Sequence, residues 1–170
     1  MTQLSSSDAA HYTVNRSDSV WTDEYILARA WAIINQRAVK AGTVFDSPTS
    51  VKEYLSMANA QYSDQSRERF AALFLDARHA LIEYRVLFEG TLTQTSVYPR
   101  ELIRAALSLD AVAVILTHNH PSGNLEASAA DKLLTSTLKT ALATVDVRLL
   151  DHIITCRDTR TLSMAEQGDI

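Results

Sequence analysis

The 170-residue sequence predicts an α/β (α+β) fold in which helices sandwich a mixed β-sheet. Helical and strand patterns follow one another in the order α, α, β, β, α, β, α, β. The run Ala111 to Thr117, AVAVILT, is continuously apolar and is typical of a central strand buried on both faces. A chain of this length has room for one ordinary core.

Two helices are expected in the first third of the chain. Trp21 to Lys40 mixes aromatic and aliphatic residues with charges and stops at Gly42, a typical C-terminal cap. Ser50 and Glu53 form a capping-box pattern, which predicts a second helix from Val51 to Ala60. A polar loop, residues 61–67, should follow.

The middle of the chain predicts a hairpin and a helix. Two apolar runs, Arg69 to Asp76 and Ala80 to Phe88, are separated by three residues, as in an antiparallel hairpin. Pro99 stands where a helix can begin, and Glu101 lies in its favourable first turn. This helix should end near Leu109.

The last third predicts one more crossover and a closing strand. The segment HNHPSGNLEA, residues 118–127, indicates a loop because it contains Pro, Gly and Asn. A helix from Ser128 to about Ala143 should follow it, then a strand from Val147 to Thr155 and a short one from Thr161 to Met164.

Composition places the chain among soluble globular proteins, with 46% apolar and 21% charged residues. The net charge of −4 supplies no broad basic face, so nucleic acid is a poor first partner. The lone Cys156 excludes an internal disulfide and a CxxC zinc knuckle, which favours a reducing compartment. Because no signal-peptide core or membrane-spanning run occurs, we expect a cytoplasmic protein without membrane contact.

Three residues form a candidate metal site. His118 and His120 are one residue apart at a strand end, where the period of two points both imidazoles to the same face. Asp131 lies in the first turn of the next helix, and the intervening turn can bring it back beside them. Two imidazoles and one carboxylate suit a single zinc ion and leave its fourth position open, which indicates catalysis.

Each of these residues alone has an ordinary structural explanation. A histidine at a strand end is usually a polar surface residue, and Ser128 with Asp131 is the S-x-x-D pattern of a helix cap. The combination of both histidines with Ser128 and Asp131 is much rarer than its parts. The metal hypothesis therefore depends on the whole set.

The spacing of that set, H118-N-H120, seven residues, S128, two residues and D131, resembles the JAMM motif of MPN+ metalloproteases. The strings HNHPSGNLEASAAD, YPRELIRAALSLDAVAVILT and LLDHIIT are similar to the RadC branch of that family, over about residues 48–170. The resemblance implies a cytidine-deaminase-like MPN domain there, preceded by a polar segment and a helix in residues 1–47. It also implies zinc on His118, His120 and Asp131, with Ser128 steadying the reacting oxygen.

The resemblance further implies a glutamate base at the start of a strand well before the two histidines. Glu68, ahead of Phe70 to Leu75, occupies the corresponding place, and Glu101 is the alternative. A glutamate at a helix start already has an electrostatic reason to be there, so Glu68 is favoured. We expect Glu68 to act as the catalytic base, and Ser128 to be the second catalytic residue, as the hydrogen-bond donor to the reacting oxygen.

Two functions remain open from the sequence. The first is a zinc-dependent metallopeptidase that hydrolyses amide or isopeptide bonds in a peptide or protein substrate of unknown identity. The second is a non-catalytic binding module, associated with DNA repair, in which the metal site is vestigial. Longer RadC proteins carry a helix-hairpin-helix segment that residues 1–47 do not show, and the complete ligand set favours the enzyme. Asp151 and His152 are expected to be structural.

Overall fold

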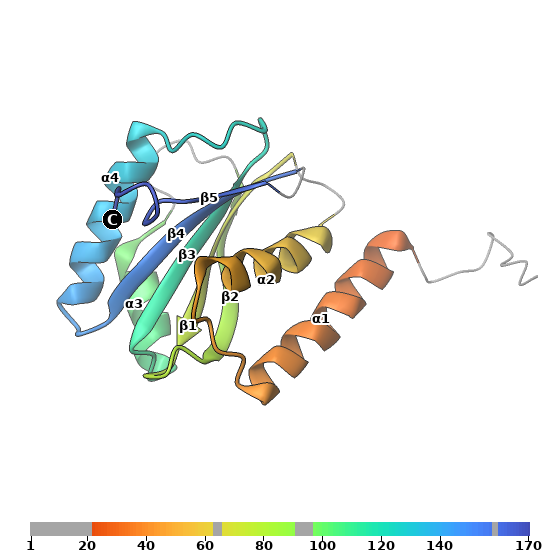
Figure 1. The fold of residues 1–170 in the computed structure, drawn as a ribbon, viewed down its shortest axis with the longest axis horizontal. Coiled ribbons are helices and arrows are strands. Elements are labelled where there is room, and N and C mark those ends of the chain that lie inside the picture. Colours follow the sequence, from red (N-terminus) through yellow and green to blue (C-terminus); the bar gives the residue numbers. More distant parts are fainter. Residues whose placement is uncertain (1–21, 63–65, 91–96, 158–159) are drawn as a thin grey trace, which may run out of the picture.

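The computed structural model describes residues 22–62, 66–90, 97–157 and 160–170. Within these ranges helices cover both faces of one five-stranded sheet (Figure 1). The elements in chain order are α1 Asp23–Ala41, α2 Pro48–Ala60, β1 Glu68–Leu75, β2 Leu81–Gly90, α3 Pro99–Ser108, β3 Ala113–His120, α4 Ala129–Ala143, β4 Arg148–Cys156 and β5 Thr161–Ser163. The predicted α/β class is confirmed.

The sheet is mixed, as predicted, and its strand order is β2-β1-β3-β4-β5. Strand β1 pairs antiparallel with β2 and with β3, and β4 pairs antiparallel with β5. The only parallel pair in the described sheet is β3 with β4, which α4 connects as a crossover helix. The carboxyl ends of β3 and β4 therefore lie side by side at one edge.

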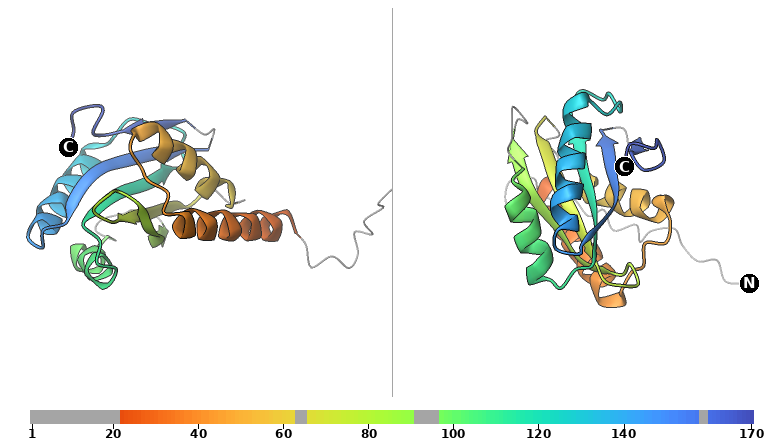
Figure 2. Two further views of the ribbon diagram at one scale, coloured as in Figure 1. Left: turned by 60° about the horizontal axis from the view of Figure 1, so that its bottom comes forward. Right: turned by 90° about the vertical axis from the view of Figure 1, so that its left-hand side faces the viewer.

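Two hydrophobic layers hold the helices to the sheet. Alternate residues of β1 point to opposite faces. Phe70 and Phe74 pack with α3 and α4, whereas Leu73 and Leu75 pack with α1 and α2. Figure 2 shows α3 and α4 together on one side of the sheet and α2 on the other. The predicted sandwich is confirmed.

The start of α2 differs from the predicted capping box. Its N-cap is Ser47, whose hydroxyl accepts a hydrogen bond from the backbone N–H of Ser50 at 3.4 Å. The prediction of Ser50 as the cap and Val51 as the start was wrong, since the helix already begins at Pro48. Proline fits this place because it lacks only an N–H that is unsatisfied in the first helical turn anyway.

Strand β3 also differs from its predicted bounds. It begins at Ala113 and continues through His120, so the first three residues of the predicted loop are strand. Pairing with β4 continues to His120 opposite Cys156 and keeps this polar segment extended. The loop starts at Pro121, which has no N–H to donate to a neighbouring strand.

The N-terminal helix packs on the domain mainly through Trp31, whose ring meets Tyr54 and Tyr84 edge-on at 5.2 and 5.4 Å. Gly42 caps its end in the left-handed conformation, as expected. The predicted first residue of this helix, Trp21, and part of the predicted loop 61–67 lie outside the described residues. The division of the chain at residue 48 stays a prediction. None of the described helices is long and apolar enough to span a membrane.

Candidate metal centre

Three side chains converge where β3 ends and α4 begins. His118 and His120 project from the same face of β3, and Asp131 reaches them from the first turn of α4. The Nε2 atoms of the two histidines are 2.8 Å apart. The carboxylate oxygens of Asp131 lie 3.3 Å from Nε2 of His118 and 3.5 Å from Nε2 of His120. The structure thus brings together the residues predicted to hold a metal.

These distances place one candidate ligand atom from each residue close enough to hold a single ion. Zinc bonds of about 2.05 Å to nitrogen and oxygen imply ligand-to-ligand edges of about 3.3 Å. The distance from His118 to Oδ1 of Asp131 has this length, whereas His120 faces the other oxygen, Oδ2, and the edge between the imidazoles is about half an ångström shorter. His118 and Asp131 are buried, and His120 borders the surface. The group is therefore preformed, with one ligand at the solvent boundary.

Hydrogen bonds hold the lone pairs of both imidazoles toward Asp131. His120 Nδ1 lies 2.6 Å from the backbone oxygen of Asn124, and only a protonated Nδ1 can donate to that acceptor. Its neutral form then carries the lone pair on Nε2. When His118 has the same tautomer, three atoms with free lone pairs face one another: Nε2 of His118, Nε2 of His120 and a carboxylate oxygen of Asp131. Such a set needs a proton or a metal ion between its members to be stable.

The electrostatics of the cluster favour a positive charge beside Asp131, whether a proton on the Nε2 atom of a histidine or a metal ion. Burial would raise the pKa of Asp131, but hydrogen bonds from His118, His120 and Ser128 hold it far below its ordinary value. The hydrogen bond to Asp131 raises the pKa of His120. The carboxylate is therefore ionised at neutral pH, the state that binds a metal.

A buried chain of hydrogen bonds lies behind the two inner ligands. His118 Nδ1 is 2.8 Å from His152 Nε2, and His152 Nδ1 is 2.6 Å from Thr135 Oγ1. The Thr135 hydroxyl donates to the backbone oxygen of Asp131 at 2.6 Å. One assignment of protons satisfies every link: each imidazole donates from Nδ1, and His118 keeps its Nε2 lone pair for a metal.

His152 was expected to be only structural, and the structure places it directly behind a candidate ligand. Burial lowers its pKa well below the ordinary value, which keeps the ring neutral. The sequence signal was the Asp-His step of LLDHIIT. It could not be interpreted without the pairing of β4 beside β3, in which His152 stands opposite Leu116.

Ser128 caps α4 and holds Asp131. Its hydroxyl and its backbone N–H donate to Oδ2 of Asp131 at 2.6 and 2.8 Å, and the N–H of Asp131 donates back to the hydroxyl at 3.1 Å. The predicted S-x-x-D cap is confirmed. The same bonds leave Oδ1 of Asp131 facing His118.

Glu68 is the first residue of β1, the antiparallel neighbour of β3. Its negative charge contributes to the raised pKa of His120. The Asn119 side chain, which lies between the two histidines in sequence, accepts from the N–H of Arg69 at 2.6 Å and donates to the carbonyl of Arg67 at 2.9 Å. Asn119 thus ties the backbone on both sides of Glu68 to the end of β3.

A model of the RadC-like JAB domain family matches residues 27–169. The chain belongs to this family. It is 55% identical over 137 residues to a UPF0758 protein of Leptothrix cholodnii, covering 81% of this chain and 59% of that protein. A UPF0758 protein of Variovorax paradoxus is 54% identical over 130 residues, 76% of this chain and 56% of its own length. The chain spans somewhat more than half the length of the relatives it matches.

Glu101, the alternative base of this RadC-like JAB domain, has partners on its own helix. Its carboxylate forms ion pairs with Arg104 and, at 3.5 Å, with Arg100. The choice of Glu68 over Glu101 as the base stays a prediction.

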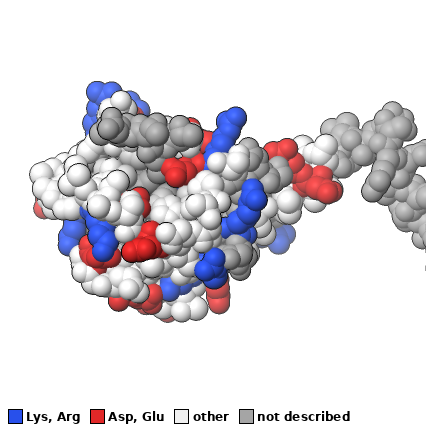
Figure 3. All heavy atoms as spheres, turned by 90° about the horizontal axis from the view of Figure 1, so that it is seen from above, with Lys and Arg blue, Asp and Glu red and all other residues white. Residues whose placement is uncertain are grey.

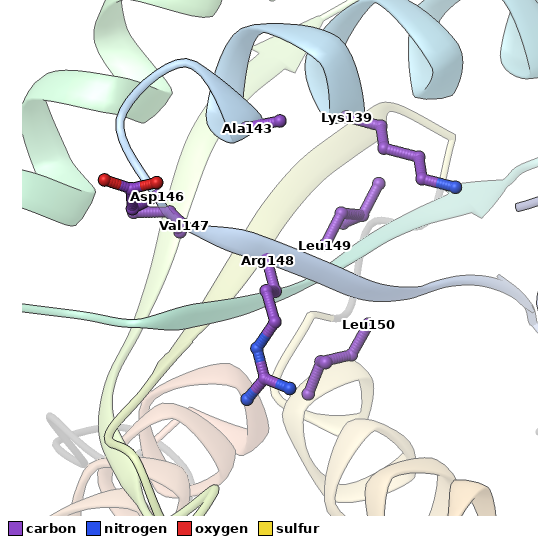
Figure 4. A pocket seen from close by; sticks show the side chains of 7 residues that line it. All are labelled: Lys139, Ala143, Asp146, Val147, Arg148, Leu149 and Leu150. Carbon is purple, nitrogen blue, oxygen red and sulfur yellow. The ribbon is translucent and has the colours of Figure 1, made fainter.

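A pocket of the RadC-like domain lies away from the candidate metal centre, between the end of α4 and the start of β4 (Figure 4). Lys139, Arg148 and Leu149 are among its lining residues. Strand β4 runs parallel to β3, with Arg148 opposite Ala113 at the amino end, whereas His120 lies at the carboxyl end. The two sites are separated by roughly 20 Å of strand.

Acidic and basic side chains are interspersed on the face seen from above in Figure 3. This distribution accompanies a net charge of −4 over the whole chain. The described part of that face shows no continuous basic stripe of the kind that follows a phosphate backbone.

Proposed function

We propose that this RadC-like JAB domain is a zinc-dependent hydrolase of amide or isopeptide bonds in peptide or protein substrates. The observation that carries the proposal is the preformed group of His118, His120 and Asp131, whose ligand atoms all lie within 4.8 Å of one another, with Glu68 on the adjacent strand end. Three protein ligands leave one coordination position for the reaction. Two imidazoles and a carboxylate favour zinc over the hard cations that prefer oxygen alone.

Each residue has a distinct part in the proposed reaction. A zinc ion bound there would supply an activated water near neutral pH and polarise the scissile carbonyl. Glu68 would take the proton from the attacking water and pass it to the leaving nitrogen. The backbone N–H of Ser128 would hold Asp131, while its hydroxyl would turn from Oδ2 of Asp131 to donate to the oxygen that becomes negative. His152 would position His118. Asn119 would position the strand end that carries Glu68.

The proposal is tested with the purified 170-residue chain. Zinc-loaded protein is incubated with a peptide library and with a library of lysine isopeptide-linked peptides, and new amino termini and released lysines are identified by mass spectrometry. Cleavage that disappears with a chelator and returns with zinc supports the proposal. A protein that binds zinc and cleaves neither library would instead favour the non-catalytic binding module.

Ser128→Ala should lower both activity and stability. Loss of the cap should cost about 1 kcal/mol of unfolding free energy, because a hydroxyl that satisfies the first turn is removed. Turnover should fall as well, since Asp131 loses one of the bonds that orient it. Urea unfolding and library cleavage measure the two effects separately. A destabilised but fully active variant would make Ser128 a cap and nothing more.

Replacing His152 with Leu should weaken zinc binding by about 10- to 100-fold, because His118 loses the acceptor that fixes its tautomer. His152→Gln should lose less affinity, since its amide oxygen can still accept from Nδ1. Ile153→Val, at the next buried position of β4, is the control for core disturbance. Competition with a chromophoric chelator gives the affinities. Unchanged affinity in a folded His152→Leu protein would remove the positioning role.

A further inference from the structure

Helix α1 leaves most of its surface uncovered. Trp31 is its only buried residue, and residues 22–30 are all exposed. Figures 1 and 2 show the amino-terminal half of α1 extending away from the sheet and α2. An isolated helix of this length is marginal in water, so tertiary contacts normally stabilise it.

The uncovered side carries an apolar stripe. The packed side consists of Trp31, Asn35 and Ala38, which are spaced four and three residues apart. A second set with helical spacing, exposed and on the opposite side, contains Ile26, Ala30, Ile33 and Arg37. Ile26 is 48% exposed and Ile33 is 37% exposed. Leu27 and Ile34, four residues before and three after Trp31, lie beside the packed side. Such a stripe usually marks a contact surface.

Charges at the two ends of the stripe show which partner fits. Asp23 and Glu24 lie in the first turn of α1, and Arg37 and Lys40 lie toward its end. In an antiparallel pair of α1 helices centred between Ala30 and Ile33, Asp23 of one copy stands level with Lys40 of the other. A parallel pair would instead place like charges together.

The apolar residues obey the same symmetry. About that centre Ala30 stands level with Ile33 and Ile26 with Arg37, whose aliphatic stem can cover the isoleucine. The small Ala30 side chain allows close approach at the middle of the pair. A two-fold axis requires one patch to complement itself, and this stripe does so in both charge and shape.

We propose that α1 pairs with α1 of a second copy of this chain, antiparallel, to form a two-fold symmetric dimer. The proposal is independent of the hydrolase proposed above, because no residue of the candidate metal centre lies on α1. Residues 1–21 or a different protein are the competing occupants of the stripe, and either would leave the isolated chain without the dimer.

Sedimentation velocity of the full 170-residue chain from about 1 to 100 µM tests the dimer. We expect a species of twice 18.8 kDa that dissociates on dilution. Ala30→Glu should raise its dissociation constant by about 30-fold or more, because it buries a charge at the centre. Leu133→Glu on α4, where the side chain is 70% exposed, should leave the dimer unchanged. A monomer at every concentration, or a dimer insensitive to Ala30→Glu, would overturn the proposal.

Cross-linking decides the orientation. Asp23→Cys and Lys40→Cys proteins are mixed under mild oxidation, and wild type with its buried Cys156 serves as the control. The antiparallel pair predicts disulfides between the two different variants. Disulfides of each variant with itself would indicate parallel helices and contradict the proposed interface.

Discussion

Glu68→Gln is expected to reduce turnover by a factor of about 100 to 10,000 while zinc content stays near one ion per chain. Gln keeps the size of the side chain but cannot accept a proton. Zinc should remain because the three ligand atoms come from β3 and α4 rather than from β1. Initial cleavage rates on the best library substrate, together with elemental analysis of the same sample, measure both quantities.

Glu101→Gln is the matched control, since it makes the same chemical change on a helix where the carboxylate pairs with Arg104. It should alter turnover far less than Glu68→Gln does. The opposite order, with zinc retained in both proteins, would show that the base has been assigned to the wrong element. Loss of zinc in Glu68→Gln would instead make Glu68 part of the metal shell.

The combined replacement of His118 and His120 by Ala should abolish zinc binding and cleavage together. Wild type purified without a chelator should contain about one zinc per chain, because two imidazoles and a carboxylate form a selective set. Zinc should also raise the melting temperature of wild type, since a ligand that binds only the folded state stabilises it. The double variant should show neither the metal nor the thermal shift.

Folding of the double variant needs its own control, because His118 is buried and His152 loses a partner with it. Asp131→Asn keeps the size of the side chain and its capping oxygen but removes the ligand charge. It should retain the circular dichroism of wild type and lose most of the zinc. Full zinc content in either folded variant would exclude this group as the metal site.

Much of the fold could be predicted from local patterns. The AVAVILT run predicted the central strand, and the two apolar runs around Ala77 to His79 predicted the hairpin. Helix caps could be predicted where one interaction dominates, as at Gly42 at the end of α1 and at Ser128 at the start of α4. The errors came at Ser47 and at the end of β3. At the first place a second capping pattern, Ser50 with Glu53, was taken for the start, and at the second a polar strand end resembled a loop.

The candidate ligands could be predicted because their spacing is local. His118 and His120 share a strand face, and Ser128 and Asp131 share a helix turn, so each pair follows from short-range geometry. Glu68 could only be placed by family resemblance. The antiparallel register of β1 with β3, which places Phe70 opposite His118, brings its strand end beside the histidines.

The sequence by itself determined the element order, the sandwich and the ligand set, because periodicity, caps and motif spacing are properties of neighbouring residues. Only the tertiary structure decided the roles of His152, Thr135 and Asn119. The contacts of His152 with His118 and Thr135, and of Asn119 with Arg67, join residues 17 to 52 positions apart along the chain. Strand pairing and helix packing create those contacts, and a pattern confined to a few neighbouring residues contains no information about which distant strands will pair.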